Sequence, residues 1–151
     1  MTRRTASRGF TFIEMMVVLA IIGMAAAVVV PAIDAGLDSR EVRRATRQIA
    51  ATMHHMRTEA VATGRLRRMR ISPTKNAVET DDHSRWAELT DRAIIERIDG
   101  GSMAGDGTVD ILFYANGSTS GADITIASRR DRSSNRIRLK LDPLIGTVRV
   151  E

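Results

Sequence analysis

Between Met15 and Ile33 the chain has no charged side chain, and nearly every residue is Met, Val, Leu, Ile or Ala. At about 1.5 Å per residue, a helix over this run is almost as long as the roughly 30 Å hydrocarbon core of a bilayer. Starting the helix at Phe10 makes it long enough, but places Glu14 inside the hydrocarbon. A carboxylate there costs about 2.5–3.5 kcal/mol on insertion scales, so we expect Glu14 to have a cationic partner and a function. Residues 10–33 are therefore predicted to form a membrane helix with one functional acid.

Two simpler interpretations of this segment are a cleaved secretory signal and a plain membrane anchor. A secretory signal explains the basic residues Arg3, Arg4 and Arg8 and the apolar run that follows them. However, the run is longer than the apolar region of such signals, and no A-x-A cleavage site closes it before Asp34. A plain anchor explains the run as well, but neither interpretation explains the acid at its start.

The stretch from Gly9 to Glu14 reads Gly-Phe-Thr-Phe-Ile-Glu, with a basic leader before it and an apolar helix after it. In this fixed order it resembles the type III signal of type IV pilins and pseudopilins. The resemblance implies that a prepilin peptidase cuts between Gly9 and Phe10, removes residues 1–9 and methylates the new amine of Phe10. It also implies a single-pass protein of the inner membrane, with the leader in the cytoplasm and the C-terminal part in the periplasm.

The physical chemistry of Glu14 agrees with this resemblance. A carboxylate is tolerated in lipid when a cation neutralises it. The amine that cleavage creates on Phe10 of a neighbouring subunit is such a cation, and the pair would set the axial register between two helices. We therefore interpret Glu14 as an assembly residue and not as a catalytic one.

Pro31 lies inside the helical pattern and cannot donate a backbone hydrogen bond to the carbonyl of Ala27. We expect a helix that continues with a kink at Pro31. The alternative is that the membrane helix ends at Pro31 and a second helix begins near Asp34.

Residues 34–64 are predicted to form the amphipathic half of the same long helix, which ends at Gly64. Apolar residues at steps of three and four form one stripe: Val42, Ala45, Ile49, Met53, Met56 and Ala60. Basic residues fall mostly off that stripe: Arg40, Arg43, Arg44, Arg47 and Arg57. We interpret this basic face as solvated, with the acids Asp34, Asp38 and Glu41 nearby. An acidic partner or lipid headgroups are the alternative.

Residues 65–151 are predicted to form a β-rich domain. Strands are expected over residues 66–72, 77–80, 86–89, 93–98, 109–114, 124–126, 137–141 and 147–150. Residues 72–76 and Asn116-Gly117 are predicted turns, and residues 100–107 a glycine-rich loop. The alternation predicts one antiparallel sheet with a buried face, on which the amphipathic helix packs. The predicted fold class is therefore α+β.

The second half adds to the resemblance. The run from Ile111 to Ser118 with its Asn-Gly-Ser turn, the strands at 124–126 and 137–139, and the closing Gly146-Thr147-Val148 are similar to the C-terminal domain of the GspH/FimT family. That family contains minor pseudopilins of type II secretion and related minor pilins, which have the type IV pilin-like fold. There is no acid cluster near the C-terminus of the kind that forms the calcium loop of major pseudopilins.

The resemblance implies a minor pseudopilin near the tip of a periplasmic pseudopilus, which helps to drive protein export across the outer membrane. Implied partners are prepilin peptidase, other major and minor pseudopilins, an inner-membrane assembly platform and membrane lipid. The alternative is a FimT-like minor pilin of a type IV pilus that binds DNA for natural transformation. Its candidate phosphate contacts are Arg129, Arg130, Arg132, Arg136, Arg138, Lys140 and Arg149.

Composition favours the secretion role over DNA binding. The net charge is +5, but three of these charges are arginines of the leader, so the processed chain would carry about +2. We therefore favour a solvated basic loop and expect no nucleic-acid partner.

The residues also indicate no enzyme, metal site or cofactor. The chain has no Cys, which excludes a thiolate zinc site and a cysteine nucleophile. His54 and His55 are adjacent on a helix and point in different directions, so they are poorly placed as a metal pair. Asp81, Asp82 and His83 have no further ligand at a suitable spacing, and the chain has no nucleophile motif.

Overall fold

The computed structural model describes residues 10–81, 86–104, 106–133 and 135–151. The predicted leader with its cleavage residue Gly9, and the loop residues Asp82 and His83, lie outside the described residues. The chain divides into two compact units between Gly36 and Leu37.

Helix α1 extends from Phe12 to Thr63 and includes Pro31, so the alternative of a second helix beginning near Asp34 is wrong. Thr11 caps its start, because the backbone N–H of Glu14 donates to Thr11 Oγ1 at 3.3 Å and that of Met15 to the Thr11 carbonyl at 3.2 Å. Gly64 ends the helix in the left-handed conformation with φ of 65°, as the sequence predicts. The kink at Pro31 stays a prediction.

The second unit contains the strands, which form two antiparallel sheets. The first sheet has five strands in the order β3-β2-β1-β6-β5: β3 (Trp86–Glu88), β2 (Ala77–Thr80), β1 (Arg67–Ser72), β6 (Val109–Phe113) and β5 (Ser102–Met103). The second has four in the order β4-β7-β8-β9: β4 (Ala93–Gly100), β7 (Ala122–Ser128), β8 (Arg136–Leu141) and β9 (Val148–Val150).

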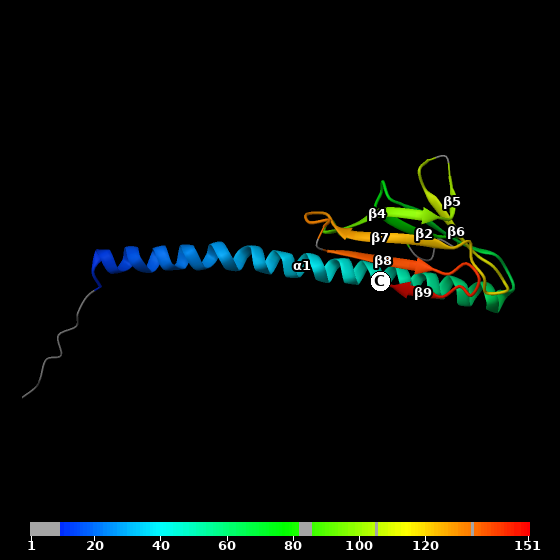
Figure 1. Cartoon of the computed structure of the whole chain (residues 1–151), viewed down its shortest axis with the longest axis horizontal. Coiled ribbons are helices and arrows are strands. Elements are labelled where there is room, and N and C mark those ends of the chain that lie inside the picture. The colour runs from blue at the N-terminus through cyan, green and yellow to red at the C-terminus, as the bar shows by residue number, and fades with distance from the viewer. Residues whose placement is uncertain (1–9, 82–85, 105, 134) are drawn as a thin grey trace, which may run out of the picture. The chain divides into compact units, whose positions relative to one another are not determined.

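One hydrophobic core joins both sheets to the part of α1 in the second unit. Every residue of the predicted helical stripe is at least 94% buried, and Ile49, Met53 and Met56 are among the largest fully buried side chains. Inward-facing strand residues meet them, including Ile111, Phe113, Ile124, Ile126 and Leu139. Figure 1 shows β7, β8 and β9 alongside this part of the helix. The predicted fold class, a helix packed on antiparallel β-structure, is confirmed.

The prediction of a single antiparallel sheet is wrong. The described strands form two sheets, and β6 and β7 belong to different ones. The predicted turn at Asn116-Gly117 reverses the chain, but the returning segment makes only one bridge, between Phe113 and Thr119. Thr119 then donates its N–H to the Pro143 carbonyl at 2.9 Å, which binds the chain to the second sheet. The predicted glycine-rich loop also contains a short strand, β5, which pairs with β6.

Candidate functional site

The apolar part of α1 presents its side chains to the exterior. The segment Phe12–Val30 has a mean hydropathy of 2.6, and none of it is buried by the residues that the structure describes. Phe10, Phe12 and Ile13 are 76%, 82% and 67% exposed. So large an apolar surface is stable only when something covers it. The segment is long and apolar enough to cross a bilayer.

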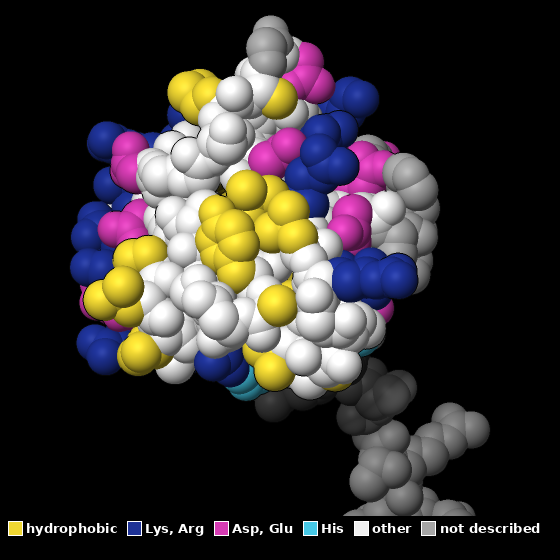
Figure 2. All heavy atoms as spheres, turned by 90° about the vertical axis from the view of Figure 1, so that its right-hand side faces the viewer, with side chains coloured by type: hydrophobic (Ala, Val, Ile, Leu, Met, Phe, Trp, Pro, Cys, Tyr) yellow, Lys and Arg dark blue, Asp and Glu magenta, His cyan; other side chains and the backbone are white. Residues whose placement is uncertain are grey.

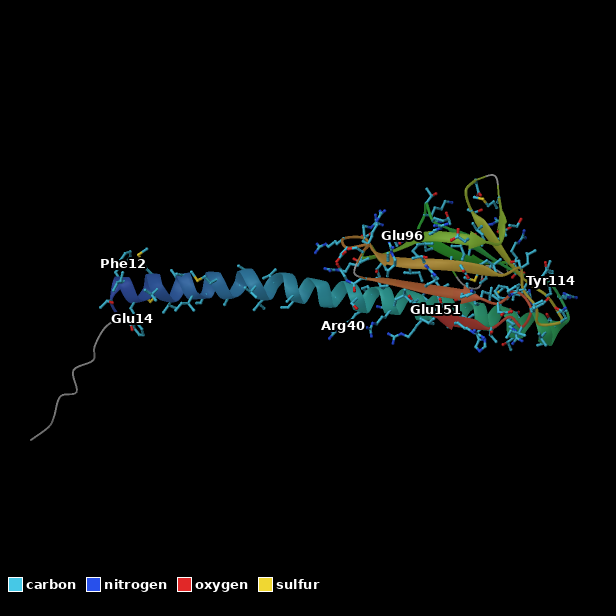
Figure 3. The ribbon with its side chains drawn as sticks, in the orientation of Figure 1. Phe12, Glu14, Arg40, Glu96, Tyr114 and Glu151 are labelled. Carbon is cyan, nitrogen blue, oxygen red and sulfur yellow. The ribbon has the colours of Figure 1, made fainter. Side chains whose placement is uncertain are left out.

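Glu14 lies in the first turn of this segment (Figure 3). With Thr11 as the N-cap, Glu14 occupies the third helical position, which is the acid position of a capping box. Its negative charge also lies at the positive end of the helix dipole. No ion pair joins the Glu14 carboxylate to another described residue.

Asp38 is buried at the start of the second unit, with only 4% exposed. Its carboxylate accepts a hydrogen bond from Arg92 Nη1 at 2.8 Å and another from Ser128 Oγ at 3.3 Å. The backbone N–H of Arg129 also donates to the Arg92 carbonyl. This cluster joins α1 to the segment before β4 and to the end of β7. The expectation that Asp38 lies beside the solvated basic face of the helix is therefore wrong, because Asp38 is buried.

Arg57 joins three elements at the other end of the second unit. Its Nε donates to the Gly117 carbonyl at 3.0 Å. Gly146, with φ of 63°, lies so close that a Cβ on it would be 2.6 Å from Arg57 Nε. The end of α1, the turn at Gly117 and the turn between β8 and β9 therefore pack together without space for another side chain.

The turn between β8 and β9 is held by Asp142. Its Oδ1 accepts the backbone N–H groups of Leu144 at 2.8 Å and Ile145 at 3.1 Å. The hydrogen bond from the Ile145 N–H, and to a lesser extent that from the Leu144 N–H, keeps the pKa of Asp142 below its usual range. Leu144 and Ile145 are nevertheless 83% and 52% exposed. Figure 2 views this end of the unit, where apolar side chains gather.

The arginines proposed to bind DNA lie in the loop after β7 and on strands β8 and β9. Arg129, Arg130 and Arg132 lie in the loop after β7, where Arg129 Nε donates to the Asp91 carbonyl at 2.8 Å. Arg136 forms an ion pair with Glu96 at 2.9 Å.

The remaining cations of that set lie on the other face of the hairpin from the core. Arg138 and Lys140 alternate with the buried Leu139 and Leu141 on β8, and Lys140 lies directly opposite Arg149 on β9. Arg136, Arg138 and Lys140 therefore share the exposed face of β8.

Sequence reasoning missed the Arg57–Gly146 packing and the burial of Asp38. It also missed that Arg43 and Arg47 of α1 line the same groove as Arg136 of β8. None of these contacts joins residues that are near one another in the sequence, so no local signal could have indicated them.

The exposed apolar helix start, its acid, and the continuation of the helix into a domain with two antiparallel sheets define a type IV pilin-like protein. Residues 4–30 match the prokaryotic N-terminal methylation motif, and residues 45–144 match the family described as type II transport protein GspH. The chain belongs to the GspH family.

A relative and several solved structures agree with this assignment. The chain is 30% identical over 139 residues to the Type II secretion system protein H of Xanthomonas campestris pv. campestris. The matched region covers 85% of this chain and 78% of the relative. The minor pseudopilin EpsH from the Type 2 Secretion System of Vibrio cholerae superposes with a TM-score of 0.60 at 13% identity, over 74% of this chain and 96% of EpsH. The type IV minor pilin FimU of Pseudomonas aeruginosa has a TM-score of 0.58 at 14% identity, over 74% and 89% of the two chains. At these identities the two structures support the fold.

Proposed function

We propose that this chain is a minor pseudopilin of a type II secretion system, a structural subunit that helps to drive protein export across the outer membrane. The observation that carries the proposal is the combination, in one chain, of the N-terminal methylation motif with a GspH domain. The relative in Xanthomonas and the fold shared with EpsH support the same role. The role is structural and involves no reaction catalysed by this chain.

The N-terminal segment supplies the assembly step. Prepilin peptidase cuts after Gly9 and methylates the amine of Phe10. The exposed apolar side chains of α1 then pack against lipid or against the helices of other pseudopilins, with the following domain in the periplasm. The exposure of the segment Phe12–Val30 supports this step, because no other described part of the chain covers it.

Glu14 gives the assembly its register. An uncompensated carboxylate in the hydrocarbon is costly, by about 2.5–3.5 kcal/mol on insertion scales. Pairing with the Phe10 amine of the next subunit removes most of that cost, and only one axial offset between two helices allows the pair. The position of the carboxylate in the first turn of α1 supports this role.

The test is a Glu14→Gln variant, which keeps the shape of the side chain and removes its charge. We expect normal cleavage and membrane insertion, but loss of co-purification with the major pseudopilin and loss of export. The matched control is Glu41→Gln, which removes an acid from the same helix in the second unit. Full assembly and export by the Glu14→Gln variant would refute the charge-pairing mechanism.

A further inference from the structure

Four arginines form one continuous face of α1 just after the membrane segment. Arg40, Arg43, Arg44 and Arg47 are spaced at i, i+3, i+4 and i+7, so they lie side by side along the helix, and all four are exposed (Figure 3 labels Arg40). We call these four residues the arginine face. Like charges at these spacings repel one another and weaken a helix. A face of this kind is therefore better explained by an anionic partner than by helix stability.

The nearby acids do not neutralise the arginine face. Asp38 is buried and bound to Arg92. Glu41 accepts a hydrogen bond from the Thr90 hydroxyl at 3.2 Å and reaches Arg44 only at 3.9 Å. Among the described residues, Arg40, Arg43 and Arg47 have no ion-pair partner.

The tertiary structure adds a cation from the second sheet. Arg43 and Arg47 share an open groove of about 440 Å³ with Arg136 of β8. Ile137 and Val150 contribute apolar side chains to this groove. Two acids are also near, since Glu151 lines the groove and Glu96 pairs with Arg136, so the arginines of α1 supply most of its unpaired positive charge. The guanidinium groups of the groove match the phosphate of a phospholipid, and its apolar side chains match the lipid's acyl chains.

We propose that the arginine face and this groove bind the phosphate group of an anionic phospholipid of the membrane in which the chain is anchored. Guanidinium groups bind phosphate oxygens in pairs, and basic residues close to a membrane span are attracted to anionic lipid. The inference rests on membrane anchoring and not on assembly into a pseudopilus.

Covalent geometry favours lipid over other anions. Arg40 follows Val30, the last residue of the membrane segment, by only ten positions. An extended chain spans at most about 3.6 Å per residue, so Arg40 stays within roughly 35 Å of the end of the hydrocarbon in any arrangement. Along a helix the distance is about 15 Å. Lipid headgroups are therefore always within reach of the arginine face, whereas a soluble anion must be recruited from solution.

The test measures which phospholipid the full chain retains. The chain is purified in a neutral detergent and incubated with equal amounts of phosphatidylglycerol and phosphatidylcholine, and the retained lipid is counted by mass spectrometry. We expect selective retention of phosphatidylglycerol that weakens as salt is raised. The preference should fall about fivefold for each arginine removed, in Arg43→Gln and then in the Arg43→Gln/Arg47→Gln double variant.

The controls separate lipid binding from folding and from other functions. Arg65→Gln removes an exposed arginine just beyond the end of α1 and should keep the preference. Glu14→Gln should also keep it, so failure of the assembly role would be distinguishable. The double variant should melt at the same or a slightly higher temperature, because repulsion on the helix is relieved. A lower melting temperature with unchanged lipid preference would show that these arginines serve the fold, and would overturn the proposal.

Two further results would overturn it. One is equal retention of the two lipids by the unmodified chain. The other is a gel-shift titration in which the double variant loses affinity for a DNA duplex while keeping its preference for phosphatidylglycerol. That result would assign the arginine face to nucleic acid.

Discussion

Replacing Gly146 by Ala should destabilise the second unit through two effects that the structure separates. Gly146 has φ of 63°, a conformation that an L-residue adopts at a cost of about 1–2 kcal/mol. A Cβ there would also collide with the Gly117 carbonyl oxygen and lie 2.6 Å from Arg57 Nε. The Arg57–Gly117 hydrogen bond therefore has to break or move. For a partly buried bond this costs about 1 kcal/mol more.

The expected loss is thus about 2–3 kcal/mol in the free energy of unfolding. For a domain of this size, 1 kcal/mol corresponds to roughly 4 °C in melting temperature, so we expect a decrease of about 10 °C. The assay is thermal unfolding of the fragment 37–151, followed by circular dichroism. This fragment contains every described residue of the hydrophobic core, the first of which is Val42.

Gly64→Ala is the matched control. Gly64 has nearly the same φ, 65°, but a Cβ on it would meet no atom within 4 Å. It should lose only the backbone contribution, about 1–2 kcal/mol. In an Arg57→Ala background the difference between the two glycine variants should shrink, since the hydrogen bond is already absent. If Gly146→Ala melts no lower than Gly64→Ala, the steric argument is wrong.

Three further predictions concern the buried Asp38, Asp142 in the turn between β8 and β9, and cleavage after Gly9. Asp38→Asn should lower the free energy of unfolding by about 2 kcal/mol, measured by urea unfolding, because Arg92 loses its anionic partner while remaining partly exposed. Ser128→Ala removes only the longer hydrogen bond to that carboxylate and should cost less. The lowered pKa of Asp142 means that its ionised form stabilises the fold above the ordinary pKa, and that this stability is lost as the pH falls through the folded-state value. Melting temperatures of Asp142→Asn should therefore depend less on pH below about 5 than those of the unmodified chain, and an unchanged slope would count against this assignment. Gly9→Leu should leave an uncleaved precursor on a gel, and normal processing would contradict the proposed cleavage site.

Local patterns in the sequence predicted most of the fold. The step of three and four residues from Val42 to Ala60 indicated which helix face is buried, and all of that stripe is buried. Alternation along Val109–Phe113 indicated the inward side of β6, and Gly64 indicated the end of α1. These features depend on the conformation of neighbouring residues, which periodicity and backbone preferences reveal directly.

The function could also be predicted from a local pattern, the segment from Gly9 to Glu14. A processing signal and a membrane helix are defined by residues that are adjacent in the chain. The match to the N-terminal methylation motif and to the GspH family agrees with that reading of the sequence. The roles of Phe10, Glu14 and Pro31 stay predictions.

Only the tertiary structure decided how the strands divide between two sheets and which charged side chains are buried or brought together. The sequence by itself determined the long helix, its apolar segment, its buried stripe and the alternation of the strands. It did not show that β6 and β7 belong to different sheets, that Asp38 is buried against Arg92, or that Arg136 joins Arg43 and Arg47. Periodicity reports which side of an element is buried but not which element lies against it. These contacts exist only because both sheets share one core with the helix, which brings distant residues together.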